Sequence, residues 1–157
     1  MTVLGVISDT HGLLRPEAMD ALRGAAHILH AGDIGAPEIL DELRTIAPVT
    51  AVRGNVDRAV WARTIADTEV FQVEGVSIYM LHILGELDLK PEASGFGVVV
   101  YGHSHMPKVE VKNGVLYFNP GSVGPRRFKL PVTVGKLIVE GGAVRGEIIE
   151  LRVSGSR

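Results

Sequence analysis

The N-terminal third of the chain alternates short apolar runs with segments that begin at a proline, and this alternation constrains the fold more than any other feature. The apolar runs occupy residues 3–8, 27–33 and 49–55. Their length and composition are typical of buried strands. Pro16 and Pro37 open the intervening segments, and proline is favoured in the first turn of a helix. Strands joined through helices pair in parallel with right-handed crossovers, so we predict a parallel β-α-β-α-β arrangement.

The same pattern predicts helices over residues 16–24, 37–47 and 58–66. The second half of the chain instead has strands joined by turns. Its predicted strand regions are 69–82, 98–105, 109–121 and 132–151. Asn113-Gly114 and Gly141-Gly142 lie inside two of them, and such pairs favour tight hairpins. Since no linker or repeat interrupts the chain, we expect one α/β domain over residues 1–157, with a frayed end at 153–157.

Composition excludes several classes of protein. Hydrophobic residues make up 46% of the chain, which excludes disorder, and no apolar run approaches the roughly 18–20 residues that span a bilayer. The net charge of −2 argues against an extended nucleic-acid surface or a membrane surface. The apolar start is too short for a secretory signal, and the absence of cysteine excludes disulfides and thiolate metal sites. These features favour a cytoplasmic protein.

Polar residues that can bind metals follow the apolar runs. They are Asp9, His11, Asp33, Asn55, His82, His103 and His105. Ligands of open α/β sheets bind just beyond the carboxyl ends of the strands, so these side chains are placed to share one site. Glycine precedes Asp33, Asn55 and His103, which suits tight turns and close backbone approach. Mixed nitrogen and oxygen ligands favour Mn, Fe, Co, Ni or Zn over Mg or Ca.

Each of these residues also has an ordinary structural interpretation. Asp9 could cap a helix, Asp33 could belong to a turn, and His82 could be a hydrogen-bonded core histidine. Asn55 could occupy a left-handed turn. The two histidines of "GHSH" are harder to explain in this way, and the complete set is far more specific than any member.

The ordered set D-x-H, G-D, G-N, H and G-H-x-H resembles the calcineurin-like metallophosphoesterase superfamily. The segment "FNPGSVGPRR" at 118–127 is similar to one in its small single-domain bacterial and archaeal phosphodiesterases, so the resemblance runs from Ser8 to about Arg127. It implies a four-layer α/β/β/α sandwich of two mixed β-sheets flanked by helices. It also implies hydrolysis of a small phosphate ester by in-line attack of a hydroxide that bridges two metal ions.

The resemblance further implies a ligand set for each ion, with manganese the favoured metal. One ion would be held by Asp9, His11, Asp33 and His105, and the other by Asp33, Asn55, His82 and His103. Asp33 would bridge the two ions, and we expect Asp33, Asn55 and His82 to take part in catalysis. Two divalent ions with two aspartates and a hydroxide keep a net positive charge, which attracts a phosphate ester.

Other residues near these motifs have smaller expected roles. A basic cluster of Arg126, Arg127 and Lys129 could steer a phosphate, and within it Arg126 is the expected substrate contact, with Arg53 a weaker candidate. We expect His30 to pack behind the site, and His27 to lie at the surface or an interface. Ile83 stands where the superfamily usually has glycine, so the loop after His82 is expected to differ in shape.

The stretch "GNVD" departs from the superfamily pattern. In much of the superfamily a histidine follows G-N and is the proposed proton donor to the leaving group, but here Val56 stands at that position. The small branch often lacks this histidine too. Valine cannot donate a proton, and Asp57 could replace the histidine only if burial raised its pKa.

Two other functions remain open at this point. A metal-dependent nuclease would need a basic track and stacking aromatics, whereas aromatic residues make up only 5% of the chain. A non-catalytic scaffold is the second alternative, because a eukaryotic retromer subunit is similar to this branch. The complete ligand set favours an enzyme. The hairpin-rich end of the chain is compatible with a homodimer.

Overall fold

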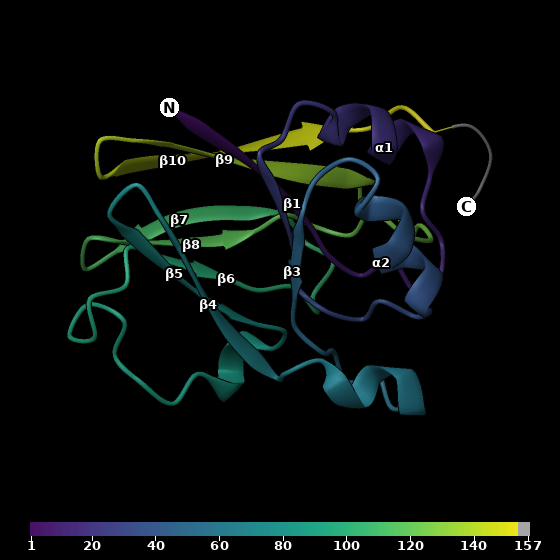
Figure 1. Ribbon diagram of the computed structural model, residues 1–157, viewed down its shortest axis with the longest axis horizontal. Helices are drawn as coiled ribbons and strands as arrows, with labels where there is room; N and C mark the ends of the chain where they lie inside the picture. The colour runs from purple at the N-terminus through teal and green to yellow at the C-terminus, as the bar shows by residue number, and fades with distance from the viewer. Residues whose placement is uncertain (154–157) are drawn as a thin grey trace.

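The computed structural model describes residues 1–153, and the remaining residues of the expected frayed end, 154–157, lie outside the described part (Figure 1). The elements of the first half are β1 (Thr2–Ile7), α1 (Pro16–Leu22), β2 (His27–His30), α2 (Pro37–Leu43), β3 (Val49–Ala51) and the 3-10 helix η1 (Val60–Thr64). Those of the second half are β4 (Thr68–Val73), β5 (Val76–Leu81), the 3-10 helix η2 (Leu84–Glu86), β6 (Val98–Val100), β7 (Lys108–Lys112), β8 (Val115–Asn119), β9 (Thr133–Glu140) and β10 (Ala143–Glu150).

These strands form two mixed five-stranded sheets, which confirms the predicted sandwich. The first sheet has the order β10-β9-β1-β2-β3, and the second has the order β4-β5-β6-β8-β7. β1, β2 and β3 pair in parallel, as do β5, β6 and β8, while the outer strands of the second sheet pair antiparallel. Ile7 is paired with His30, and His30 with Ala51, so the loops that follow β1, β2 and β3 leave the sheet at the same edge.

The main core lies between the two sheets. Leu4, Val6 and Leu29 of the first sheet form one cluster with Met80 and Phe118 of the second. The alternation of side chains along each strand directs these residues inward, and the other face of the first sheet packs on α1 and α2. Figure 1 shows the two α-helices lying together on one side of the molecule.

The fourth layer is thinner than the others. An irregular segment over 84–96, which contains η2, covers the outer face of the second sheet and packs Leu84, Leu87 and Phe96 against buried side chains such as Tyr79. The helix expected at 58–66 is present only as the 3-10 helix η1. It has no side-chain cap, and valine and threonine at its ends favour an α-helix poorly. Within residues 1–153, no helix combines the length and apolar character needed to cross a membrane.

Candidate metal centre

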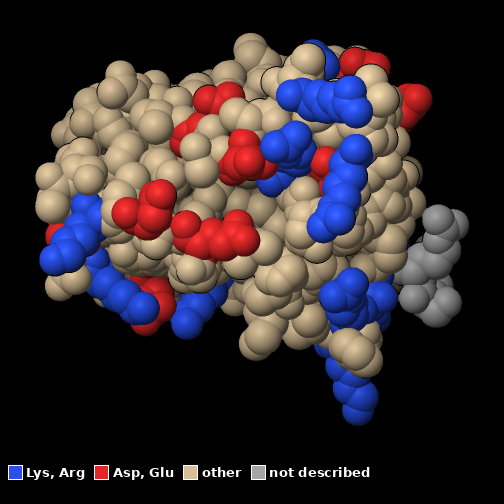
Figure 2. Space-filling model, turned by 90° about the horizontal axis from the view of Figure 1, so that it is seen from below, with Lys and Arg blue, Asp and Glu red and all other residues tan. Residues whose placement is uncertain are grey.

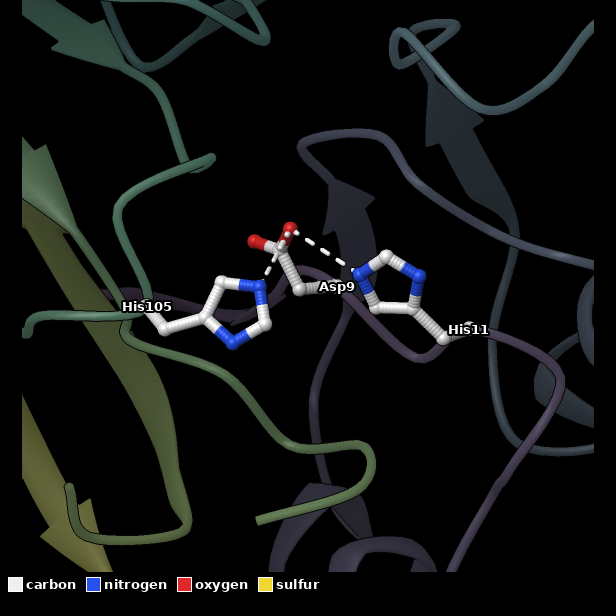
Figure 3. Close-up of side chains that lie close together, drawn as sticks. All are labelled: Asp9, His11 and His105. Carbon is white, nitrogen blue, oxygen red and sulfur yellow. Dashed lines mark ion pairs between the residues drawn. The ribbon is translucent and has the colours of Figure 1, made fainter. Parts of the chain in front are cut away.

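The loops that follow β1 and β6 bring Asp9, His11 and His105 together, and we call these residues the first group. One ligand atom from each lies within 4.8 Å of the others. Figure 3 shows the two imidazole rings on either side of the Asp9 carboxylate, each with a nitrogen turned toward it. The Nε2 atoms of His105 and His11 lie 3.3 and 3.6 Å from Asp9 Oδ1.

Asp33, His82 and His103 form a second group of the same kind. They come from the loops after β2, β5 and β6. The Nε2 atom of His82 lies 3.1 Å from Asp33 Oδ2 and 3.9 Å from Asp9 Oδ1. His11 Nε2 lies 3.6 Å from Asp33 Oδ2, so the Asp33 carboxylate lies between histidines of both groups. The two groups therefore make one continuous cluster of ligand atoms.

The hydrogen bonds of His82 determine what its free nitrogen can do. Its Nδ1 lies 2.7 Å from the carbonyl oxygen of Ala31, which can only accept a hydrogen bond, so Nδ1 carries the proton. In the neutral ring Nε2 then presents a lone pair toward Asp33 Oδ2. Two acceptors at this distance need a proton or a cation between them, so His82 is oriented as a metal ligand would be.

Other buried atoms of the cluster also lack hydrogen-bond partners. Among the described residues, Asp9 Oδ1, His11 Nε2 and His82 Nε2 face one another without partners, and His105 Nδ1, on the side of its ring away from Asp9, also lacks one. Buried polar atoms without partners are costly in an ordinary core. A set of carboxylate and imidazole atoms that converge without bonding to one another fits divalent transition-metal ions.

The same proximity shifts the pKa values of these groups. Burial alone would raise the pKa of Asp9, but His105, His11 and Ser8 outweigh burial and hold that pKa well below its ordinary value. The contact with Asp9 raises the pKa of His11 against the effect of burial. Burial opposes the positive charge of His82, yet Asp33 and the Ala31 carbonyl raise its pKa. The cluster therefore attracts positive charge.

The backbone is strained at this cluster. Asp9, His11, Asp33, His103 and His105 have φ values of 59°, 46°, 57°, 71° and 64°. Within residues 1–153 only eight non-glycine residues have positive φ, and five of them are candidate ligands. Each such conformation costs on the order of 1–3 kcal/mol and persists only where the surroundings enforce it. This concentration of strain marks the cluster as a functional site.

His30 connects the loops that carry the two aspartates. Its buried Nδ1 accepts a hydrogen bond from Gly32 N at 3.1 Å, so the ring proton is on Nε2, which donates to Thr10 Oγ1 at 3.0 Å. Thr10 Oγ1 in turn donates to Ile34 O at 2.7 Å. Burial lowers the pKa of His30 to about 4, so the ring is neutral. His30 packs behind the site as predicted.

His27 lies outside the cluster. Its Nε2 is 2.8 Å from Thr50 Oγ1, and its ring centroid is 4.3 Å from that of Phe71.

Asp57 has a role that the sequence did not reveal. Its buried carboxylate accepts hydrogen bonds from the backbone N–H groups of Ile34, Gly35 and Gly54, at 2.9 to 3.1 Å. It therefore ties the loop after β2 to the loop after β3. Since both oxygens accept from backbone groups, the structure does not support the suggestion that Asp57 replaces the missing proton donor.

Residues of the segment 118–127 hold the first group from behind. Asn119 Nδ2 donates to Gly102 O and to Ser104 Oγ in the histidine loop, at 3.2 and 3.1 Å. Ser122 Oγ donates to Asp9 O at 3.2 Å, and the buried Arg15 donates to Gly124 O at 3.1 Å. Asn119, Ser122 and Arg15 were not singled out from the sequence, and only the segment "FNPGSVGPRR" pointed toward two of them.

All three glycines expected to allow close approach do so, and a Cβ atom at Gly32, which has a φ of 102°, would lie 2.7 Å from His82 Nδ1. A Cβ atom at Gly54 would overlap the backbone nitrogen and Oδ1 of Asp33, and one at Gly102 would overlap Ser8 Oγ. Any larger residue at either position would displace the carboxylates of the cluster.

The remaining predicted site residues lie around the cluster. Asn55 is exposed and, with His82, lines a pocket, while the next residue, Val56, donates its N–H to Asp33 Oδ1 at 3.1 Å. Arg53 lines the same pocket and pairs with Asp67. Arg126 and Arg127 are both exposed, and the charge of Arg127 acts to lower the pKa of His11.

The family described as the calcineurin-like phosphoesterase superfamily domain matches residues 1–142. A "Probable metallophosphoesterase" of Methanothermobacter thermautotrophicus is 36% identical, over 94% of this chain and 91% of that protein. "Phosphodiesterase YfcE" of Escherichia coli is 29% identical, over 87% of this chain and 88% of that protein.

A solved structure supports the fold. The crystal structure of Vps29 from Entamoeba histolytica, as a single mutant, has a TM-score of 0.74 at 21% identity. It covers 96% of this chain and all of the other. At this identity the similarity concerns the fold alone.

Proposed function

Because the chain belongs to the calcineurin-like phosphoesterase superfamily, we propose that it is a phosphodiesterase with a dinuclear metal centre and a small phosphate ester as its substrate. The family makes the protein a metal-dependent phosphoester hydrolase. The observation that carries the proposal is the cluster itself, in which unpartnered ligand atoms converge from loops held in strained conformations.

We assign two overlapping ligand sets to the cluster. Asp9, His11, Asp33 and His105 would hold one ion, and Asp33, Asn55, His82 and His103 would hold the other. Two divalent ions bound there would stabilise charge on the phosphoryl oxygens and lower the pKa of water. The nitrogen and oxygen donors favour manganese or a neighbouring transition metal.

The side chains beside the second group determine whether the leaving alcohol can receive a proton. Hydrolysis joins a water oxygen to phosphorus and breaks the bond from phosphorus to one alcohol oxygen, which must leave as an anion or receive a proton. Val56, next to Asn55, is 48% exposed and has no proton to give, and Asp57 is occupied by backbone groups. We therefore propose that acidic alcohols such as phenols are expelled much faster than alkyl alcohols.

The test combines elemental analysis with a substrate panel. We expect two first-row transition ions per chain, loss of activity with a chelator, and recovery with Mn²⁺. Bis(p-nitrophenyl) phosphate should be hydrolysed, and p-nitrophenyl phosphate is the monoester comparison. Protein without metal and with an unchanged rate after chelation would contradict the proposal. Calorimetry that detects no metal-dependent phosphate binding would favour a scaffold instead.

Manganese as the native metal, a cytoplasmic location, a homodimer and a single domain over 1–157 stay predictions. Neither a nuclease nor a scaffold is favoured by an observation of this structure.

A further inference from the structure

A pocket of about 360 Å³ opens directly beside the second group. His82 and Asn55 line it, and its other walls come from the start of β4 and the residue before it, from β5 and from the segment that contains η2. The His82 side chain is only 3% exposed, and its buried Nε2 atom has no hydrogen-bond partner in the described chain. The pocket is thus continuous with the candidate metal centre and is placed to take a group attached to the phosphate.

The walls of this pocket carry an excess of negative charge. Asp67, Glu86 and Asp88 line it, and Arg53 is the one arginine or lysine in its lining. Arg53 is already paired with Asp67, with Nη2 at 2.9 Å from Oδ1. The carboxylates of Glu86 and Asp88 make no ion pair or hydrogen bond within residues 1–153. On the face drawn in Figure 2, acidic side chains extend across the middle, and most basic side chains lie toward the two sides.

An aromatic side chain completes the lining. Tyr79 of β5 lines the pocket and is fixed against Phe96, with ring centroids 5.2 Å apart. Carboxylates beside an aromatic side chain are features that recognise ammonium groups, and here the carboxylates contribute most, because Tyr79 is only 9% exposed. A second phosphate or a carboxylate would instead be repelled by Glu86 and Asp88.

We propose that this pocket binds a positively charged, ammonium-bearing ester group of the substrate, such as an amino alcohol esterified to the phosphate. The inference rests on the proposed function, because the phosphate itself is taken to lie at the metal centre. It adds that the protein selects among phosphodiesters by charge. Its volume lies at the small end of ligand sites, which suits a group of this size.

The kinetic test uses two substrates of nearly equal shape. p-Nitrophenyl phosphocholine carries a quaternary ammonium group, and p-nitrophenyl 3,3-dimethylbutyl phosphate replaces that nitrogen with carbon. We expect kcat/KM to favour the cationic ester roughly tenfold, since two exposed carboxylates and one ring each contribute modestly. The preference should decrease as salt is added.

Variants of the pocket test whether its carboxylates cause the preference for the cationic ester. The double variant Glu86→Gln with Asp88→Asn should bring the ratio close to one, through a fall in kcat/KM for the cationic ester. Glu92→Gln is the matched control, because Glu92 is exposed in the same segment but does not line the pocket. Equal kcat/KM values for the two esters in the wild type, or a preference that survives in the double variant, would overturn the inference.

Binding measured by calorimetry separates this inference from the proposed function. The Mn²⁺-loaded protein is titrated with phosphocholine and with 3,3-dimethylbutyl phosphate. Tighter binding of phosphocholine in a protein that hydrolyses no diester would support the pocket and reject the phosphodiesterase. Equal binding by a protein that hydrolyses bis(p-nitrophenyl) phosphate would reject the pocket and leave the phosphodiesterase in place.

Discussion

The two groups of the metal centre contain the same kinds of side chain but differ in how the protein encloses them. In the first group, Asp9 and His105 are buried, and hydrogen bonds from the segment 118–127 hold the surrounding loops. In the second group His103 is exposed, and His82 lines an open pocket. We therefore propose that the first group would hold a metal ion more firmly, and that the second group, where Asp33 and His82 are buried but His103 is exposed, would be the side open to substrate.

Replacement of the shared residue should have the largest effect. Asp33→Asn weakens the charge at both groups, so we expect activity to fall by more than the roughly 10²–10³-fold that one electrostatic group is worth. His11→Ala is the comparison, because His11 belongs to the first group alone, and it should cost less. The measurements are the metal content and kcat of both variants. An Asp33→Asn protein with two ions and a near-normal rate would show that this carboxylate does not bridge.

A proton donor placed beside the second group should change the substrate range. Val56→His is expected to raise the rate on alkyl diesters about 10²-fold, the lower end of what general-acid catalysis supplies. Rates on aryl diesters should change little, since phenols with a pKa of about 7–10 leave readily as anions. The measurement is the dependence of kcat on leaving-group pKa for both proteins. A wild-type rate that barely depends on this pKa, when bond cleavage is rate-limiting, would reveal a donor that we have not identified.

Loosening the hydrogen bonds between the β2 and β3 loops should impair the second group more than the first. Asp57→Asn replaces one accepting oxygen with a donor that faces backbone N–H groups, and we expect a roughly tenfold loss of activity. If Asp57 only positions these loops, the pH profile of kcat should keep its shape. A profile that loses one limb would instead identify Asp57 as a proton-transfer group.

The two histidines of the β6 loop give a direct test of the comparison. His105→Ala removes a buried member of the first group, and His103→Ala removes an exposed member of the second. After extensive dialysis we expect His103→Ala to retain about one ion per chain and His105→Ala to retain less. Elemental analysis of the two proteins in parallel is sufficient. Equal losses would mean that the two groups do not differ in how firmly they hold metal.

The smallest expected effect concerns His30, behind both groups. An unfolded histidine titrates near pH 6.5, whereas burial lowers the pKa of His30 to about 4 in the folded protein. Between these values only the unfolded chain binds the proton, so the contribution of His30 to the free energy of unfolding is present above pH 6.5 and is lost as the pH falls toward 4. The slope should be at most about 1.4 kcal/mol per pH unit.

His30→Gln is the variant that isolates this contribution. The raised pKa values of His11 and His82 act with the opposite sign, because the folded protein then binds the extra protons. The free energy of unfolding of wild type and variant is measured with a denaturant at several pH values. The contributions of His11 and His82 are the same in both proteins and cancel in the difference. Identical slopes would mean that His30 is protonated equally in both states.

Much of the fold and of the ligand cluster follows from local patterns in the sequence. The strands end where apolar runs stop, and the Asn113-Gly114 and Gly141-Gly142 pairs do form hairpins. The supporting contacts could not be predicted, because they join residues far apart in the chain. Arg15 and Gly124 are 109 residues apart, and Ser122 and Asp9 are 113 apart. The pocket depends on how the segment 84–96 packs on the second sheet, which has no periodic signal.

The strained backbone of the ligands sets this chain apart from the most stable sequence for its fold. Glycine adopts positive φ without steric cost, so glycine at position 9, 33 or 103 would relieve strain in the metal-free protein while removing a ligand. At these positions glycine would therefore increase the stability of the fold, whereas aspartate or histidine is needed to bind metal. A descendant that had given up catalysis would be free to drift toward glycine or asparagine there. Asp9, Asp33 and His103 therefore occupy positions where the backbone favours glycine and metal binding requires a ligand.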